Sequence, residues 1–160
     1  MSCTRSLATP CAQYKSRVAE VHDGGCVCGS VRYRTTGEPA RVTVCHCRWC
    51  QRRTGSAFGV GAVFQSAQFE LTGAAPKVYR HMSDESGRWL DLHFCTSCGT
   101  NIGFTLEWAP GVFAVDAGSF DEPAWINPDK CDFRYIYLRS AQRWSALPDA
   151  VQQYEAHFRV

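Results

Sequence analysis

The stretch GGCVCGSVRY, residues 24 to 33, holds two cysteines one residue apart, followed directly by a glycine. A second pair with the same trailing glycine occurs in FCTSCGTNIGF, residues 94 to 104. Glycine permits the positive φ that turns backbone N–H groups toward two neighbouring sulfurs. Two such pairs can make the closed four-cysteine tetrahedron of a structural zinc site. The sequence therefore predicts one zinc, which joins distant parts of the chain, at Cys26, Cys28, Cys95 and Cys98; the alternative is four unconnected buried thiols.

A different cysteine pattern occurs in TVCHCRWCQRR, residues 43 to 53, where Cys45, Cys47 and Cys50 fall within six positions. These three thiolates can wrap one metal, and the only further Cys or His within ten residues is His46. A strand-like backbone would point His46 away from its neighbours on either side. Catalytic zinc sites usually have three protein ligands and one open position, whereas structural sites have four. We therefore expect an open zinc site that can accept a substrate sulfur.

Two alternatives to this open site remain at the sequence level. A distant side chain could close the site and make it structural, with Cys131, His81 and His93 as the candidates. The three cysteines could also stay without metal and oxidise, since exposed thiolates do so readily. The remaining lone cysteines are predicted to be free thiols that bind no metal: Cys3, Cys11 and Cys131.

Three arginines crowd the cysteine triplet: Arg48, Arg52 and Arg53. Guanidinium groups bind carboxylates well, so this cluster suits a small thiol that carries carboxylates. A solvated surface turn would give the same pattern. The net charge of the whole chain is only +2, which argues against a dedicated nucleic-acid binder.

Length and composition favour one globular domain. The 160 residues are enough for a single core, and 45% of them are hydrophobic. We expect a leader without fixed structure over residues 1–20 and a single zinc-binding domain over residues 21–160. No apolar run is long enough to cross a membrane, and the first 20 residues lack a signal-peptide core, so we expect a cytoplasmic protein. In such a compartment, clustered cysteines more often bind metal than form disulfides.

The hydrophobic pattern is that of a mainly β protein. Segments near residues 28–36, 88–95, 101–108 and 111–120 alternate or are apolar on both sides, and each stops at Gly, Pro or Asp. Residues 134–140 are predicted to form a late strand. Short helical turns are expected over residues 46–54 and near residues 148–154.

Taken together, these motifs resemble the glutathione-dependent formaldehyde-activating enzyme family, which includes the centromere protein V type. The resemblance runs from about Gly24 to Asp121 and includes CHCRWCQRRTGSAF and VDAGSFDEP. It implies an Mss4-like fold, in which coiled β-sheets are joined by zinc, and two zinc ions per chain. By motif, the four paired cysteines match the structural zinc ligands. The triplet Cys45, Cys47 and Cys50 matches the catalytic zinc, whose open site is expected to lose metal more easily.

The resemblance also implies an activity. The family's namesake reaction adds glutathione to formaldehyde and is classed as a carbon–sulfur lyase reaction. A small thiol and a small aldehyde are therefore the expected partners. Relatives commonly carry His in the late strand where this chain has Tyr135. Two rival hypotheses stay open: a non-catalytic zinc-binding module for a protein or nucleic-acid partner, and redox sensing through the triplet.

Overall fold

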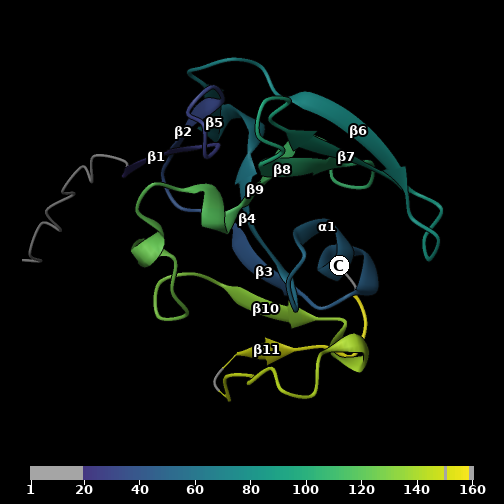
Figure 1. Ribbon diagram of the computed structural model, residues 1–160. Helices are drawn as coiled ribbons and strands as arrows, with labels where there is room; N and C mark the ends of the chain where they lie inside the picture. Colours follow the sequence, from purple (N-terminus) through teal and green to yellow (C-terminus); the bar gives the residue numbers. More distant parts are fainter. Residues whose placement is uncertain (1–19, 150, 159–160) are drawn as a thin grey trace, which may run out of the picture.

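Two β-sheets make up the part of the protein that the structure, a computed structural model, describes: residues 20–149 and 151–158 (Figure 1). The smaller sheet has three strands in the order β1-β2-β5, and the larger has eight in the order β11-β10-β3-β4-β9-β8-β7-β6. The predicted mainly β fold is confirmed, and it is consistent with an Mss4-like fold. Except for Glu20, the leader predicted at residues 1–20 lies outside the described residues, and the extent of the domain stays a prediction.

The smaller sheet follows from alternation in the sequence. Its strands are β1 (Val21–Gly25), β2 (Arg32–Thr36) and β5 (Phe69–Leu71), and both pairings are antiparallel. In β2 the buried Tyr33 lies between two arginines whose side chains reach solvent, as its period of two predicts. This sheet carries the first cysteine knuckle, which begins where β1 ends.

The larger sheet contains the other segments that the sequence predicted as strands and several that it did not. Its strands are β3 (Arg41–Cys45), β4 (Gly59–Gln65), β6 (Lys77–Met82), β7 (Trp89–Phe94), β8 (Asn101–Leu106), β9 (Val112–Asp116), β10 (Phe133–Ile136) and β11 (Gln152–Gln153). In the spatial order β3-β4-β9-β8-β7-β6, every neighbouring pair is antiparallel. β10 lies parallel to both of its neighbours, β3 and β11. The three central residues of β9 are buried, which agrees with its apolar character on both faces.

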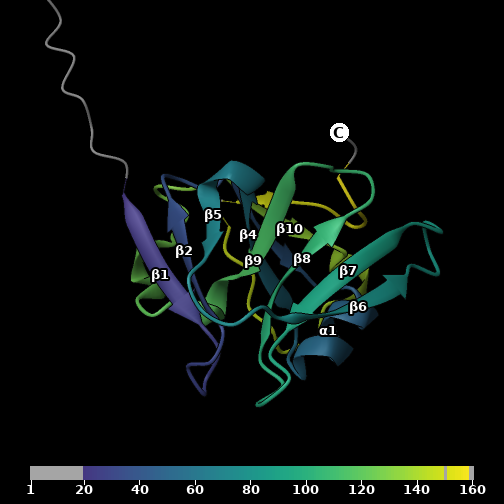
Figure 2. The ribbon, with the colours of Figure 1, turned by 90° about the horizontal axis from the view of Figure 1, so that it is seen from above.

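Aromatic side chains from the two sheets pack against one another in the core. Figure 2 shows the smaller sheet (β1, β2 and β5) beside β4 and β9 of the larger sheet. Tyr33 of β2 stacks on Phe69 with ring centroids 5.3 Å apart, and Phe69 stacks on Phe113 of β9 at 4.2 Å. Phe120 packs edge-on against Tyr33 at 5.5 Å. Cys26 and Cys95 belong to the same buried cluster, so the predicted structural site is anchored at the margin of the core.

The two predicted helical turns had opposite outcomes. The turn predicted over residues 46–54 is confirmed as α1 (Arg48–Thr54), which ends at Gly55 with φ +63°. The helix predicted near residues 148–154 is wrong, because Gln152–Gln153 forms β11 beside β10. There the backbone N–H of Tyr154 donates to the carbonyl of Tyr135 at 2.8 Å. Sheet pairing with a distant segment thus prevails over a weak local helix preference.

The late strand is shorter than its sequence suggests. β10 stops at Ile136, and the next residue, Tyr137, has the left-handed backbone angles φ 60° and ψ 40°. A single turn of 3-10 helix, η4 (Leu138–Ser140), follows it. Similar turns occur at η1 (Ser66–Gln68), η2 (Ala117–Ser119) and η3 (Pro123–Trp125). No helix in the described part of the chain is long and apolar enough to cross a membrane.

Candidate metal centres

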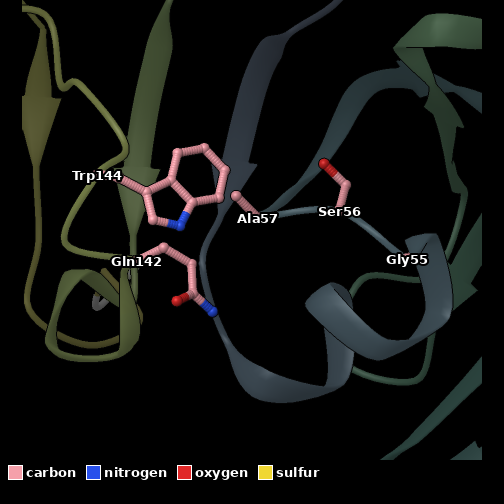
Figure 3. Close-up of a pocket in the computed structure, with 5 residues that line it drawn as sticks. All are labelled: Gly55, Ser56, Ala57, Gln142 and Trp144. Atoms are coloured by element: carbon pink, nitrogen blue, oxygen red, sulfur yellow. The ribbon is translucent and has the colours of Figure 1, made fainter.

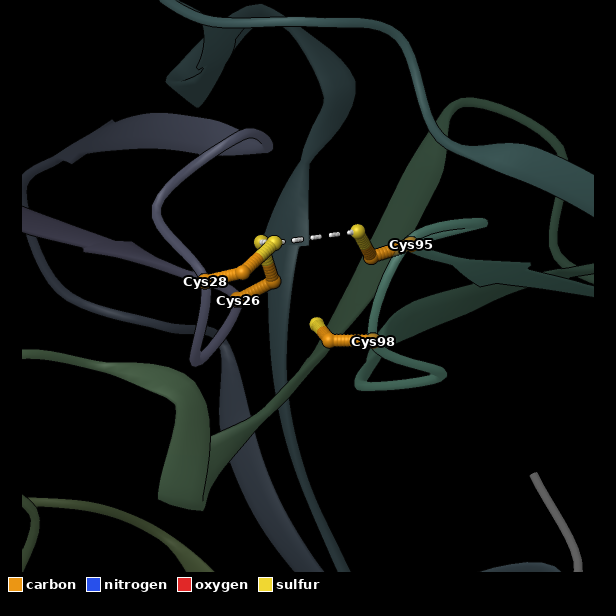
Figure 4. A group of neighbouring side chains, drawn as sticks. All are labelled: Cys26, Cys28, Cys95 and Cys98. Atoms are coloured by element: carbon orange, nitrogen blue, oxygen red, sulfur yellow. Dashed lines mark hydrogen bonds between the residues drawn. The ribbon is translucent and has the colours of Figure 1, made fainter.

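The four cysteines of the two knuckles converge on one point (Figure 4). Cys26 and Cys28 follow β1, and Cys95 and Cys98 lie between β7 and β8, so the two pairs come from different sheets. All four sulfurs lie within 4.8 Å of one another. The glycines after each knuckle have the expected positive φ, 79° at Gly29 and 73° at Gly99. The structure thus brings together the residues that the sequence assigned to a closed site.

The spacing of these sulfurs fits zinc. Zinc–sulfur bonds of about 2.3 Å place the corners of a tetrahedron about 3.8 Å apart. The Sγ atoms of Cys26 and Cys28 are 3.4 Å apart, and those of Cys28 and Cys95 are 3.7 Å apart. The backbone N–H of Val31 donates to Cys26 Sγ at 3.2 Å. A hydrogen bond with Thr100 lowers the pKa of Cys98 to about 5, so this group holds a thiolate at neutral pH.

The second group, Cys45, Cys47 and Cys50, forms where β3 ends and α1 begins. Its three sulfurs also lie within 4.8 Å of one another. Cys47 caps α1, because its Sγ accepts a hydrogen bond from the backbone N–H of Cys50 at 3.3 Å. Hydrogen bonds from Cys45 and Cys50 lower the pKa of Cys47 to about 2. The pKa of Cys45 is raised instead, by its hydrogen bonds with Cys47 and Cys50. Cys47 is therefore the principal thiolate of this triplet.

Within residues 20–149 and 151–158, no further Cys, His, Asp or Glu places a ligand atom within that distance of all three sulfurs. His81 instead stacks on Trp49 with ring centroids 4.7 Å apart, and His93 packs edge-on against Phe113 at 5.0 Å. Cys131 is buried in the main core cluster. The candidates for closing the site are thus engaged elsewhere. Cys3 and Cys11 lie outside the described residues.

His46 points away from the sulfurs, as alternation along β3 predicts. Its side chain is fully buried, and it packs against Phe58 and Tyr135 at centroid distances of 5.2 and 6.2 Å. Burial lowers its pKa below the usual 6.5, so the ring is neutral at physiological pH. His46 and Tyr135 therefore form a packed layer behind the triplet.

The three arginines have different surroundings. Arg48 and Arg52 are exposed, and Arg48 Nη1 donates to Gln51 Oε1 at 3.1 Å. Arg53 points inward, and its side chain is only 5% exposed. Both of its terminal nitrogens donate to Asp116 at 2.7 Å. Its guanidinium is thus committed to Asp116, which corrects the expectation of three accessible arginines around the triplet.

The Arg53–Asp116 pair joins the two cysteine groups. Arg53 lies beside Cys50, because a Cβ on Gly59 would lie 3.0 Å from Arg53 Nη2 and 3.5 Å from Cys50 Cβ. On the other side, the Asn101 amide, just after the Cys98 knuckle, donates to the Arg53 carbonyl at 3.1 Å. Burial alone would lower the pKa of Arg53, but the bonds to Asp116 raise it above its usual value. Sequence reasoning missed this pair because Arg53 lies in α1 and Asp116 at the end of β9, far apart in the sequence.

A C-terminal segment, residues 136–142, is hydrogen-bonded to Gln51 of α1, the residue that follows Cys50. The amide of the buried Gln51 donates to the carbonyls of His46 at 2.7 Å and Ser140 at 2.9 Å. Gln142 in turn donates to Gln51 Oε1 at 2.7 Å. Arg139 forms an ion pair with Glu85 of the β6–β7 hairpin. The surroundings of the triplet thus come from α1, this segment and that hairpin.

Two hollows flank α1. One of about 510 Å³ is lined by Gly55, Ser56, Ala57, Gln142 and Trp144, whose indole is 76% exposed (Figure 3). The other, of about 680 Å³, extends from Cys26 and Thr100 to Asp116 and reaches Gly59 beside Cys50. Thr54, Ser56 and Asn101 supply hydroxyl and amide groups to the lining of the larger hollow, alongside apolar side chains such as Phe58 and Val60.

Such a fold, a β protein with a four-cysteine and a three-cysteine group, defines a class of metal-binding proteins. The family model described as glutathione-dependent formaldehyde-activating enzyme matches residues 21–139, and the chain belongs to this family. A crystal structure of a Rhodobacter sphaeroides protein is similar at a TM-score of 0.49 and 19% identity, covering 67% of this chain and 92% of that chain.

Proposed function

We propose that this protein is a zinc-dependent enzyme that adds a small thiol such as glutathione to formaldehyde or another small aldehyde. The observation that carries the proposal is the contrast between the two groups: four sulfurs converge in one, and only three in the other. Family membership supports the same reaction class. When bound at the triplet, zinc would supply a positive charge that stabilises an incoming thiolate at neutral pH.

The chain's own residues would hold the thiol near the triplet. Cys45, Cys47 and Cys50 would hold the metal, and Arg48 and Arg52 offer two exposed cations for the carboxylates of glutathione. Together these cations would contribute roughly 0.5–2 kcal/mol after solvent screening. The larger hollow that reaches Gly59 would take the peptide backbone. Proximity of the bound thiol to the aldehyde carbon would supply much of the acceleration.

The test combines glutathione binding with the rate of condensation. Calorimetric titration of glutathione into zinc-loaded protein is run beside exchange NMR of glutathione with formaldehyde. We expect wild type to bind glutathione and accelerate formation of S-hydroxymethylglutathione, and Cys47→Ser to do neither. Cys131→Ser is the matched control, because Cys131 is buried outside both groups, and it should behave as wild type. If wild type with both sites loaded binds no glutathione, a non-catalytic zinc module replaces the enzyme proposal.

A further inference from the structure

Tyr137 has an unusual backbone for an aromatic residue. With φ 60° it is the one residue other than glycine with positive φ in the described part of the chain. Bulky side chains rarely adopt this region, because Cβ approaches the following carbonyl oxygen. Strained residues of this kind persist only where their surroundings fix them, and they cluster at functional sites.

Hydrogen bonds on both sides fix this conformation. The backbone N–H of Tyr137 donates to the carbonyl of Ala156 at 3.3 Å, and its own carbonyl accepts from the N–H of Ser140 at 3.0 Å. One residue earlier, the carbonyl of Ile136 accepts from the N–H of His46 at 3.0 Å. Residues 136–137 are therefore tied both to Ala156 and to His46, which directly follows β3.

This arrangement brings the backbone of Tyr137 to the end of the strand that leads into the triplet. Ile136 is paired with Cys45 in the register of β10 and β3, so Tyr137 directly follows the residue that lies opposite the first cysteine of the triplet. Burial raises the pKa of its phenol, and the negative charge of Glu85 raises it further. The phenol therefore keeps its proton at neutral pH, as a hydrogen-bond donor must.

The ring of Tyr137 is also held in place. The guanidinium carbon of Arg139 lies 5.5 Å from its centroid, and Arg139 is ion-paired with Glu85 at the tip of the β6–β7 hairpin. His157 packs edge-on against the same ring at 6.3 Å. A side chain held by its backbone, a cation and an aromatic neighbour is pre-organised, which is what a catalytic donor requires.

We propose that Tyr137 is a catalytic residue whose phenol donates a hydrogen bond to the aldehyde oxygen as the thiol adds; this rests on the function proposed above. The thiolate sulfur forms a bond to the carbonyl carbon, and the π pair of the C=O bond moves onto the oxygen. That oxygen takes the phenol proton, and the phenol regains, through solvent, the proton that the thiol lost. The product is the hydroxymethyl thioether, and no oxidant or reductant is needed.

The test is Tyr137→Phe, which keeps the ring and removes only the hydroxyl. In zinc-loaded protein we expect kcat for the condensation to fall about 100-fold, the usual effect of losing one donor to a developing oxyanion. Zinc content, melting temperature and the glutathione Kd should stay at wild-type values. Tyr154→Phe is the matched control, because the Tyr154 hydroxyl donates to Gln152 Oε1 in β11, and it should change kcat less than twofold.

Each other outcome overturns the inference in a distinguishable way. If wild type accelerates the condensation and Tyr137→Phe does so within twofold of it, Tyr137 is not the donor, although the proposed function stands. If Tyr137→Phe loses zinc from the triplet, its role is to support the metal. If wild type itself gives no acceleration, the proposed function fails and this inference fails with it.

Discussion

The Asp116→Asn substitution tests how the buried ion pair beside the triplet contributes to stability. It removes the counter-charge of a guanidinium that is only 5% exposed, while keeping the shape of the side chain. Breaking a buried pair in this way costs about 3–5 kcal/mol, because it leaves an uncompensated charge inside the protein. For a chain of this size the melting temperature should fall by about 10 °C or more.

An ion pair with an exposed arginine provides the control. Arg80 also donates twice to its carboxylate, through Nε and one Nη to Asp91 at 2.7 Å, but the Arg80 side chain is 56% exposed. Asp91→Asn should therefore cost about 1 kcal/mol or less. Urea unfolding of zinc-loaded protein gives both values, and zinc content measured in parallel excludes metal loss as the cause. Equal losses in the two variants would refute the reasoning that burial decides the strength of the pair.

Three further predictions concern the metal, a close contact and pH. Cys95→Ser should give unfolded or insoluble protein, since a structural zinc contributes on the order of 10 kcal/mol; unchanged melting temperature and zinc content would contradict this. Gly59→Ala should cost about 1–3 kcal/mol, because the new Cβ would lie 3.0 Å from Arg53 Nη2, whereas Gly118→Ala, with nothing within 4 Å, should cost little. Burial lowers the pKa of His22 below 6.5, and nearby Glu20 and Glu38 only partly offset this, so its neutral form stabilises the fold above that pH. That contribution is lost as pH falls through the folded-state pKa, so between pH 7.5 and 5.5 the urea midpoint of His22→Phe should drop less than that of wild type; equal drops would rule this out.

The metal centres could be predicted because their signals are local in sequence. Each knuckle fixes two sulfurs through one turn and a glycine, and the buried His46 follows from alternation along β3. The partner of Arg53 could not be found this way, because Asp116 is 63 residues away and no pattern marks it. The arginine cluster therefore suggested an exposed patch, and the structure places one of its members in the interior.

The C-terminal region was the least predictable part of the fold. Residues 152–153 become a strand only because β10 offers them an edge, and Tyr137 adopts its left-handed conformation only because two segments hold it. Neither effect depends on the propensities of the residues themselves. Tertiary contacts between distant segments decide both features. The sequence therefore predicted a helix near residues 148–154, where β11 forms, and a strand over residues 134–140, where β10 ends at Ile136.

We propose that the triplet holds a metal that accepts a fourth sulfur from a small thiol. Cobalt(II)-substituted protein tests this directly, because each thiolate ligand adds to the intensity of the sulfur-to-cobalt charge-transfer band. Titration of glutathione into protein loaded with two cobalt ions per chain should raise this band in a saturable manner, and Cys47→Ser should show no rise. A wild-type spectrum that stays constant with both sites loaded would contradict the account.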